Sequence, residues 1–215
     1  MSSNLKRVPR YTLGEEITNA VTHGAGAALA VAGTVLLLIR ASDRWGYVSA
    51  SVYGASLIIL FTMSCLYHAI SHPTAKYVMR VFDHTSIFLL IAGTYTPLTL
   101  VTLRAEIPWL GWSIFGVVWA AAAVGITLTA VSVERFKKFA MVCYIASGWC
   151  IAAAIVPLMK IMDTAGLILM LIGGIGYTVG LVFYALKIKY MHSIWHLFVL
   201  GGAVAHYFCV LFYVL

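Results

Sequence analysis

The sequence predicts an all-α integral membrane protein built as a bundle of seven transmembrane helices. Hydrophobic residues make up 62% of the 215 residues and charged residues only 10%, with a mean hydropathy of +0.97. This composition excludes an ordinary soluble domain, in which about a quarter of the residues are charged. Seven apolar stretches, each long enough to cross roughly 30 Å of hydrocarbon as a helix, lie at residues 17–39, 48–70, 84–103, 109–131, 139–158, 164–186 and 193–214.

The spans leave little sequence outside the membrane. Residues 1–215 are therefore expected to form a single membrane domain, with a short cytoplasmic segment, residues 1–16, before the first helix. Glu15 and Glu16 precede the first span where a cleavable signal peptide would carry basic residues, and its apolar run is too long for one. The first span is therefore expected to remain in the mature protein.

The distribution of basic residues predicts the orientation. Ten of the fourteen fall on one side of the predicted membrane: Lys6, Arg7, Arg10, Lys76, Arg80, Arg135, Lys137, Lys138, Lys187 and Lys189. The other side receives Arg40, Arg44, Arg104 and Lys160. By the positive-inside rule the N-terminus is cytoplasmic and the C-terminus lies outside. Because the positive charge is scattered over short loops and forms no single stripe, it argues against a nucleic-acid partner.

The spans differ in the polar and small residues that they carry. The second carries Ser64 and His68 near its end, and the third begins beside Asp83. Pro97 is expected to kink the third span, and Thr96 or a neighbouring helix would then pair with the carbonyl that proline leaves free. Glycines in the sixth and seventh spans favour close helix packing: Gly173, Gly174, Gly176, Gly180, Gly201 and Gly202.

Histidines from two spans are expected to meet at one membrane depth. His192 and His196 are four residues apart at the start of the last span, so both imidazoles share one helix face. In the predicted topology, His68 and Asp83 lie at the same cytoplasmic end. Ionisable groups inside a membrane are rare, costly and usually functional. We therefore expect His68, His192 and His196 to bind one metal ion.

The ligand set favours Zn²⁺. Three neutral imidazoles leave the fourth tetrahedral position open, which is the arrangement of a catalytic zinc carrying water. A carboxylate ligand would favour iron instead. Asp83 could supply one, but its position at a helix end better fits a group that hydrogen-bonds a bound water or an imidazole. Ser64 lies one turn deeper than His68 on the same face, where it can donate to a substrate oxygen.

The remaining histidines are weaker candidates. His72 precedes a proline at a helix end and is expected to be solvated, while His84 should point about 100° away from Asp83 and serve the structure. His23 lies at a depth similar to the trio and is an open candidate for a supporting group. His206 lies about 15 Å further along the helix than His196, so it cannot share the metal and is expected to make a buried polar contact.

Several motifs together resemble the bacterial hemolysin III family, within the wider progestin and adiponectin receptor superfamily. They are Glu15-Glu16-Ile17 to His23-Gly24, Ser64-Cys65-Leu66-Tyr67-His68, Phe82-Asp83-His84, Ala92-Gly93-Thr94-Tyr95-Thr96-Pro97 and His192-Ser193-Ile194-Trp195-His196. The resemblance covers about residues 12 to 215. It implies a seven-helix bundle with the N-terminus inside, located in the bacterial inner (plasma) membrane. It also implies zinc on His68, His192 and His196, with Asp83 holding water and Ser64 in the same site.

Three function classes follow from these observations. The first is a zinc-dependent hydrolase of a lipid amide or ester, because the resemblance extends to ceramidase-like hydrolases and to membrane lipid homeostasis. The second is a non-enzymatic membrane-stress regulator or cytolytic factor of the hemolysin type, in which zinc is structural. The third, a retinal protein, is excluded because residues 193–214 contain no lysine for a Schiff base. In the first class a membrane lipid is the expected partner.

The predicted orientation can be tested with a reporter enzyme fused after Leu215. Because the basic residues alternate by loop, we expect alkaline phosphatase, which works only outside the cytoplasm, to be active in this fusion, and a cytoplasmic reporter to be silent. Activity is measured in intact cells at matched expression. A fusion that is active only with the cytoplasmic reporter would overturn the predicted depth of the histidines.

Overall fold

The computed structural model describes residue 9 and residues 11–215. Lys6, Arg7 and Arg10, on which part of the charge argument rests, lie outside the described residues. The first helix begins at Leu13, so it includes the last residues of the predicted segment 1–16.

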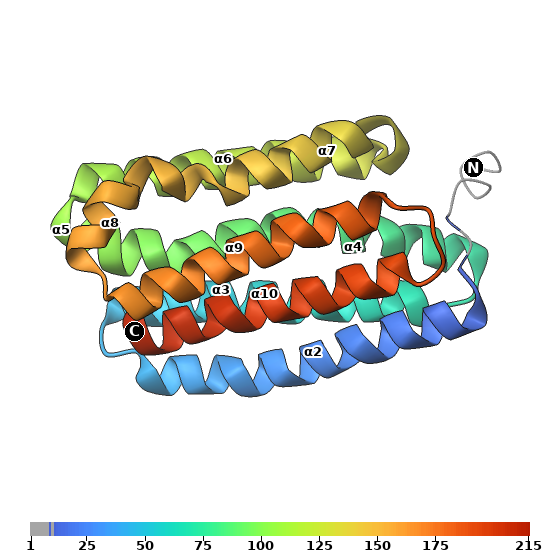
Figure 1. Cartoon of the computed structure of the whole chain (residues 1–215), viewed down its shortest axis with the longest axis horizontal. Coiled ribbons are helices and arrows are strands. Elements are labelled where there is room, and N and C mark those ends of the chain that lie inside the picture. The colour runs from blue at the N-terminus through green and yellow to red at the C-terminus, as the bar shows by residue number, and fades with distance from the viewer. Residues whose placement is uncertain (1–8, 10) are drawn as a thin grey trace.

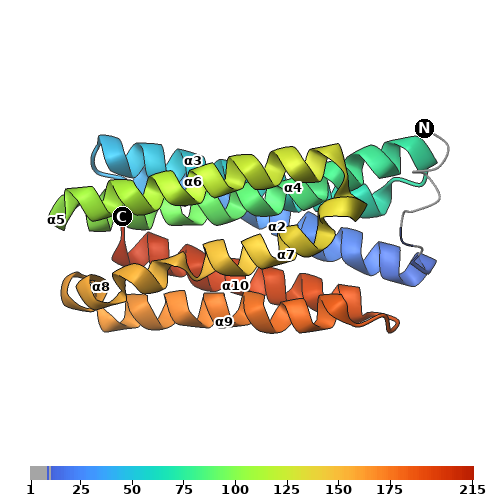
Figure 2. The same cartoon turned by 90° about the horizontal axis from the view of Figure 1, so that it is seen from above.

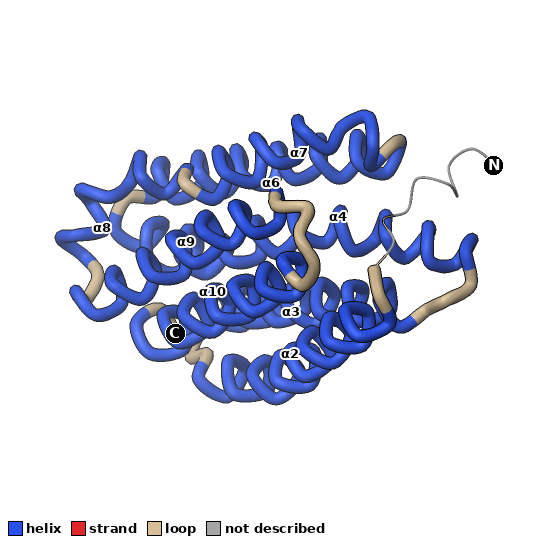
Figure 3. The backbone as a smooth tube through the Cα atoms, turned by 45° about the vertical axis from the view of Figure 1, so that its right-hand side comes forward, coloured by secondary structure: helices blue, strands red, loops and turns tan. Residues whose placement is uncertain are grey.

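The described chain is helical almost throughout, and it contains no strand (Figure 3). Seven helices are long and apolar enough to cross a membrane, which confirms the predicted fold class. They are α2 (Leu13–Arg40), α3 (Arg44–Ala69), α4 (Pro73–Pro97) continued by η1 (Leu98–Leu103) and α5 (Arg104–Glu106), α6 (Pro108–Val131), α7 (Val133–Gly148) continued by η2 (Cys150–Ala154) and α8 (Ile155–Ile161), α9 (Thr164–Ala185) and α10 (Met191–Tyr213).

The seven helices run along one another in a single bundle (Figures 1 and 2). α2, α3, α4 and α6 pack in chain order, and α10 packs between α2 and α9. α6 and α7 lie together on the side of the bundle away from α2 (Figure 1). α2 begins at the end of the bundle opposite to the end where α10 stops, as an odd number of spans requires.

Most of these helices begin before their apolar stretch because polar residues cap their first turns. Thr12 and Glu15 form a capping box at the start of α2: the Thr12 hydroxyl accepts from the Glu15 N–H, and the Glu15 carboxylate accepts from the Thr12 N–H. Asp43 caps α3 and Ser132 caps α7 through side-chain oxygens. Capping satisfies the N–H groups that a helix start leaves free.

Pro97 ends the regular part of α4, as the sequence predicted. The six residues that follow, Leu98–Leu103, form a π-helix. A π-helical turn within an α-helical rod is a known cause of bending. The Thr96 hydroxyl donates to the Ala92 carbonyl (2.8 Å) and accepts from the Trp119 indole N–H (3.2 Å). The third span therefore crosses the bundle as one continuous but irregular rod.

Glycines allow α9 and α10 to approach closely, as predicted. A Cβ atom on Gly180 would lie 2.7 Å from side-chain atoms of Phe198 and Trp195. A Cβ on Gly202 would lie 2.8 Å from the Tyr177 ring and 3.1 Å from the Gly173 carbonyl oxygen. This contact holds α10, which carries two of the candidate metal ligands, against α9.

Gly202→Ala should therefore destabilise the protein by about 1–3 kcal/mol, the usual cost of overpacking a filled core. The neighbouring Gly201 provides a matched control, because a Cβ there meets nothing within 4 Å. Gly201→Ala should be neutral or slightly stabilising, because alanine favours the helix. Thermal unfolding in neutral detergent measures both variants, and equal shifts in the midpoint would contradict this account of the α9–α10 contact.

Candidate metal centre

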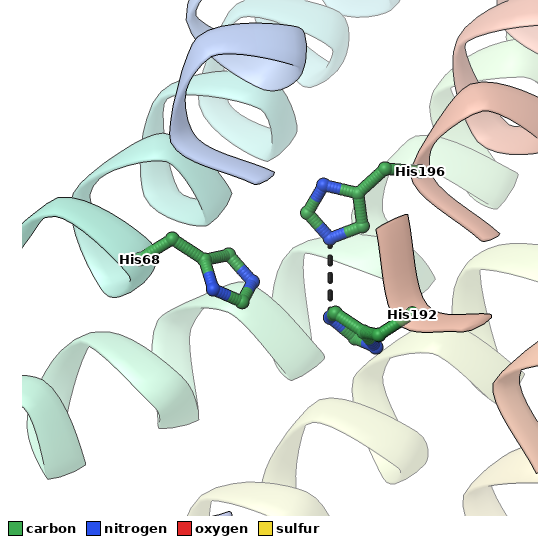
Figure 4. A group of neighbouring side chains, drawn as sticks. All are labelled: His68, His192 and His196. Atoms are coloured by element: carbon green, nitrogen blue, oxygen red, sulfur yellow. Dashed lines mark hydrogen bonds between the residues drawn. The ribbon is translucent and has the colours of Figure 1, made fainter. Parts of the chain in front are cut away.

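Three histidines from two helices meet at one end of the bundle. His68 lies in the last turn of α3, and His192 and His196 lie in the first turns of α10. One ring nitrogen of each can be chosen so that all three lie within 4.8 Å of one another. Figure 4 shows the three rings facing a shared space. The sequence prediction that these residues come together is confirmed.

The geometry of the trio fits a metal ion. The Nε2 atoms of His192 and His196 lie 3.1 Å apart. Two ligands of a tetrahedral zinc with bonds of about 2.0 Å are separated by roughly 3.3 Å. The Nε2 atom of His68 is buried and makes no hydrogen bond with the residues that the structure describes. Because a buried polar atom without a partner is costly, a metal ion at this position would satisfy it.

A carboxylate on α2 fixes the protonation of His68. Glu16 Oε2 lies 2.7 Å from His68 Nδ1, and Glu16 Oε1 lies 2.9 Å from Lys76 Nζ. An ionised carboxylate can only accept hydrogen bonds, so Nδ1 carries a proton, and in the neutral imidazole Nε2 presents its lone pair. This carboxylate–histidine arrangement is common behind metal-bound imidazoles.

Tyr11, just before α2, and His23 of α2 contact the two histidines of α10. The Tyr11 ring stacks on the His192 ring with centroids 4.9 Å apart, and the His23 ring stacks on the His196 ring with centroids 3.7 Å apart. Burial raises the pKa of the Tyr11 phenol above its usual value, so this side chain stays neutral. His23 therefore supports the site through this stacking on His196.

Two hydrogen bonds fix the start of α10 against α2. The Ser193 hydroxyl donates to Asn19 Oδ1 (2.6 Å), and the Tyr190 N–H donates to Glu15 Oε1 (2.9 Å). Tyr190 has a φ of 65°, in the left-handed region that is uncommon for a residue with a side chain. This turn directs the chain into α10 with His192 and His196 facing α2.

Asp83 lies beside the trio and outside the group of potential ligands. The Ser64 hydroxyl forms a hydrogen bond with its carboxylate, and His84 Nδ1 lies 3.4 Å from Asp83 Oδ2. The prediction that His84 points away from Asp83 is wrong, because the imidazole turns back along α4 and also contacts the Arg80 carbonyl (2.9 Å). Ser64 and His84 thus hold the carboxylate from two sides.

A cavity of about 490 Å³ extends from this polar end through the bundle. His23, Ser64, Asp83, His192 and His196 line one end, and the remaining wall is mainly aliphatic and aromatic. His206 lines the same cavity, and its Nε2 contacts the Met170 carbonyl oxygen (3.0 Å), which is the predicted buried polar contact. His72 is exposed at the start of α4, as predicted.

Sequence reasoning named His23 as an open candidate but missed the other contacts that α2 makes with the site, through Glu16 and Asn19. Glu16, Asn19 and His23 follow the spacing i, i+3, i+7, which puts three polar residues on one face of an apolar helix. That pattern was a readable signal that this face turns toward polar partners. Tyr11 carried no comparable signal.

Comparison with known proteins agrees with this architecture. The family described as Haemolysin-III related matches residues 11–207. The chain belongs to this haemolysin-III family. Two bacterial relatives of this haemolysin-III protein are Hemolysin-3 of Bacillus cereus, 44% identical over all of this chain and 98% of the relative, and the Hemolysin-3 homolog of Bacillus subtilis (strain 168), 41% identical over 94% of this chain and 96% of the relative.

A more distant relative of this haemolysin-III protein is the Monocyte to macrophage differentiation factor of Homo sapiens, 30% identical over 93% of this chain and 84% of the relative. The resemblance inferred from the motifs is therefore confirmed. Together with the seven apolar helices, the bacterial relatives identify an integral multi-pass protein of the bacterial plasma membrane.

Because Glu16 orients His68, Glu16→Gln should weaken zinc binding by about 10-fold to 100-fold, the usual effect of removing a group behind a metal-bound histidine. The affinity is measured by competition with a chelator on purified protein. Glu106→Gln, a change of the same kind at an exposed site at the other end of the bundle, is the control. Equal zinc affinity in the two variants would contradict the role of Glu16.

Proposed function

We propose that this haemolysin-III protein is an intramembrane zinc hydrolase that cleaves a lipid amide or ester, as ceramidases do, and that it acts in membrane lipid homeostasis. One observation carries the proposal: three convergent histidines lie together, and two of them, His192 and His196, line one end of a largely apolar cavity with the carboxylate of Asp83. Polar groups that converge in an apolar pocket are the usual form of a ligand or active site.

His68, His192 and His196 would hold the ion. A histidine-only set of three ligands is typical of catalytic zinc. Zinc in such a site supplies Lewis-acid chemistry and makes water a nucleophile near neutral pH. Glu16 keeps the His68 lone pair directed at the ion, and the stacked rings of Tyr11 and His23 limit the movement of the other two imidazoles.

Asp83 is the proposed general base. Its carboxylate lines the cavity beside the histidines, and it is held by Ser64 and His84 so that it can take a proton from water. Ser64 also lines the cavity, and its hydroxyl can turn from Asp83 to donate to the carbonyl oxygen of a bound lipid. These two residues are the proposed catalytic side chains.

The cavity gives the proposed substrate its class. Its volume of about 490 Å³ falls within the range of ligand-binding pockets, and its mainly apolar wall suits hydrocarbon better than a water-soluble molecule. The acyl chain of a membrane lipid would occupy this space while its amide or ester linkage lies at the polar end.

A second candidate comes from the names of the relatives. Two of them are described as Hemolysin-3 proteins, which favours a cytolytic factor or a non-enzymatic membrane-stress regulator with structural zinc. This second function predicts that the metal only joins α3 to α10, so that replacing Asp83 would have little effect on the protein's activity in cells.

Asp83→Asn distinguishes the two functions. It should preserve the fold and much of the zinc, yet lower turnover of a lipid amide or ester by roughly 10²–10⁴-fold, the usual contribution of a general base. The double variant His192→Ala/His196→Ala should lose both the metal, expected at about one ion per chain, and the activity. Zinc content and hydrolysis of labelled lipids are measured on the same purified samples.

Asp163→Asn serves as the matched control, because this exposed acid caps α9 at the opposite end and asparagine caps equally well. If zinc-loaded wild type hydrolyses no lipid amide or ester and Asp83→Asn behaves like Asp163→Asn in cells, the hydrolase proposal fails. Comparative lipidomics of cells making wild type or His196→Ala at matched levels would identify the lipid class.

A further inference from the structure

One lysine of the described chain, Lys137, lines the cavity. It belongs to the first turns of α7, and its Nζ lies 4.8 Å from the centroid of the Tyr184 ring. His192 also neighbours that ring, with ring centroids 5.8 Å apart. One aromatic ring therefore separates the Lys137 ammonium group from a candidate metal ligand.

Lys137 is not paired with an acid in the described part of the chain. The acidic side chains at this end are engaged elsewhere, in the pairs Glu16 with Lys76, Glu134 with Arg80 and Asp83 with His84. The charges on Arg80 and Lys187 add to the positive potential at Lys137. An ammonium group at the edge of a membrane that lacks a protein anion is suited to bind an anion from another molecule.

We propose that Lys137 recognises the headgroup of the lipid bound in the cavity, and that this lipid carries an anionic group, a phosphate or a carboxylate, next to its acyl linkage. The inference rests on the proposed function and narrows its substrate class. With the acyl chain in the apolar part of the cavity and the linkage near His192 and Asp83, the anionic group lies within reach of Lys137. Glycerophospholipids with a small phosphate headgroup have this arrangement.

The competing account is that Lys137 serves only the orientation of the protein in the membrane. Lys138 separates the two accounts, because it is the next residue on the same helix, is also exposed and does not line the cavity. A role in orientation predicts that the two lysines are interchangeable. A role in headgroup recognition predicts that only Lys137 affects ligand binding.

Binding of dodecyl phosphate to the purified full chain in maltoside micelles tests the inference. The comparison probe is dodecyl phosphocholine at the same mole fraction, which has the same chain and no net charge. Wild type should bind one dodecyl phosphate saturably and prefer it to dodecyl phosphocholine. Lys137→Gln should weaken this binding about tenfold, as expected for the loss of a charged hydrogen bond, while Lys137→Arg and Lys138→Gln should retain it.

Equal affinities in Lys137→Gln and Lys138→Gln would overturn the inference. Competition by inorganic phosphate at the same concentration would also overturn it, because the site would then recognise free phosphate without a lipid. The probe has no acyl linkage, so the measurement does not depend on hydrolysis. Binding that depends on Lys137 in a protein without hydrolytic activity would support the inference while the proposed function fails. Hydrolysis of neutral lipids that is unaffected by Lys137→Gln would support the proposed function while the inference about Lys137 fails.

Discussion

In hydrocarbon, a buried polar side chain must find its partner within the protein. In this chain that constraint brings polar groups from α2, α3, α4 and α10 to one end of the bundle. α2 provides most of the partners: Glu16 bonds His68, Asn19 bonds Ser193, and His23 stacks on His196. His68 Nε2 lies where the three imidazoles converge, and it is among the buried nitrogens of this network that make no hydrogen bond within the described part of the chain. A positive ion that accepts a nitrogen lone pair would satisfy this atom.

Packing between apolar helices sets the position of this network. α10 is held against α9 by glycine contacts and against α2 by the hydrogen bonds at its first turn, so its histidines have little freedom to rotate. α9 packs mainly on α10, and the cavity lies where residues of α4 and α7 face residues of α9 and α10. Trp195 and Tyr177 belong both to the glycine contacts between α9 and α10 and to the cavity wall, so the packing that positions the histidines of α10 also shapes the space that would hold a lipid.

The sequence predicts much of this arrangement because the decisive signals are local. Hydropathy identifies all seven helices, and the spacing of His192 and His196 places both rings on one face. The bonds of Glu16 and Asn19 were missed because they depend on how α2 is rotated against α3 and α10, which hydropathy does not specify. The side-chain direction of His84 was wrong because helix geometry fixes its Cβ but leaves χ1 free to turn the ring toward Asp83. The orientation in the membrane stays a prediction from charge.

Because Asp83 lies outside the group of potential ligands, the site favours a catalytic metal over a purely structural one. A fourth protein ligand would close the coordination sphere, as in structural zinc sites, whereas catalytic sites keep one position for water or substrate. Asp83 is the carboxylate nearest the trio on the cavity wall, and Ser64 and His84 engage its oxygens. These two contacts hold the carboxylate near the metal position without making it a ligand. If His68, His192 and His196 hold a zinc ion, a lipid carbonyl and a water could reach it from the cavity, where Asp83 is already held in place.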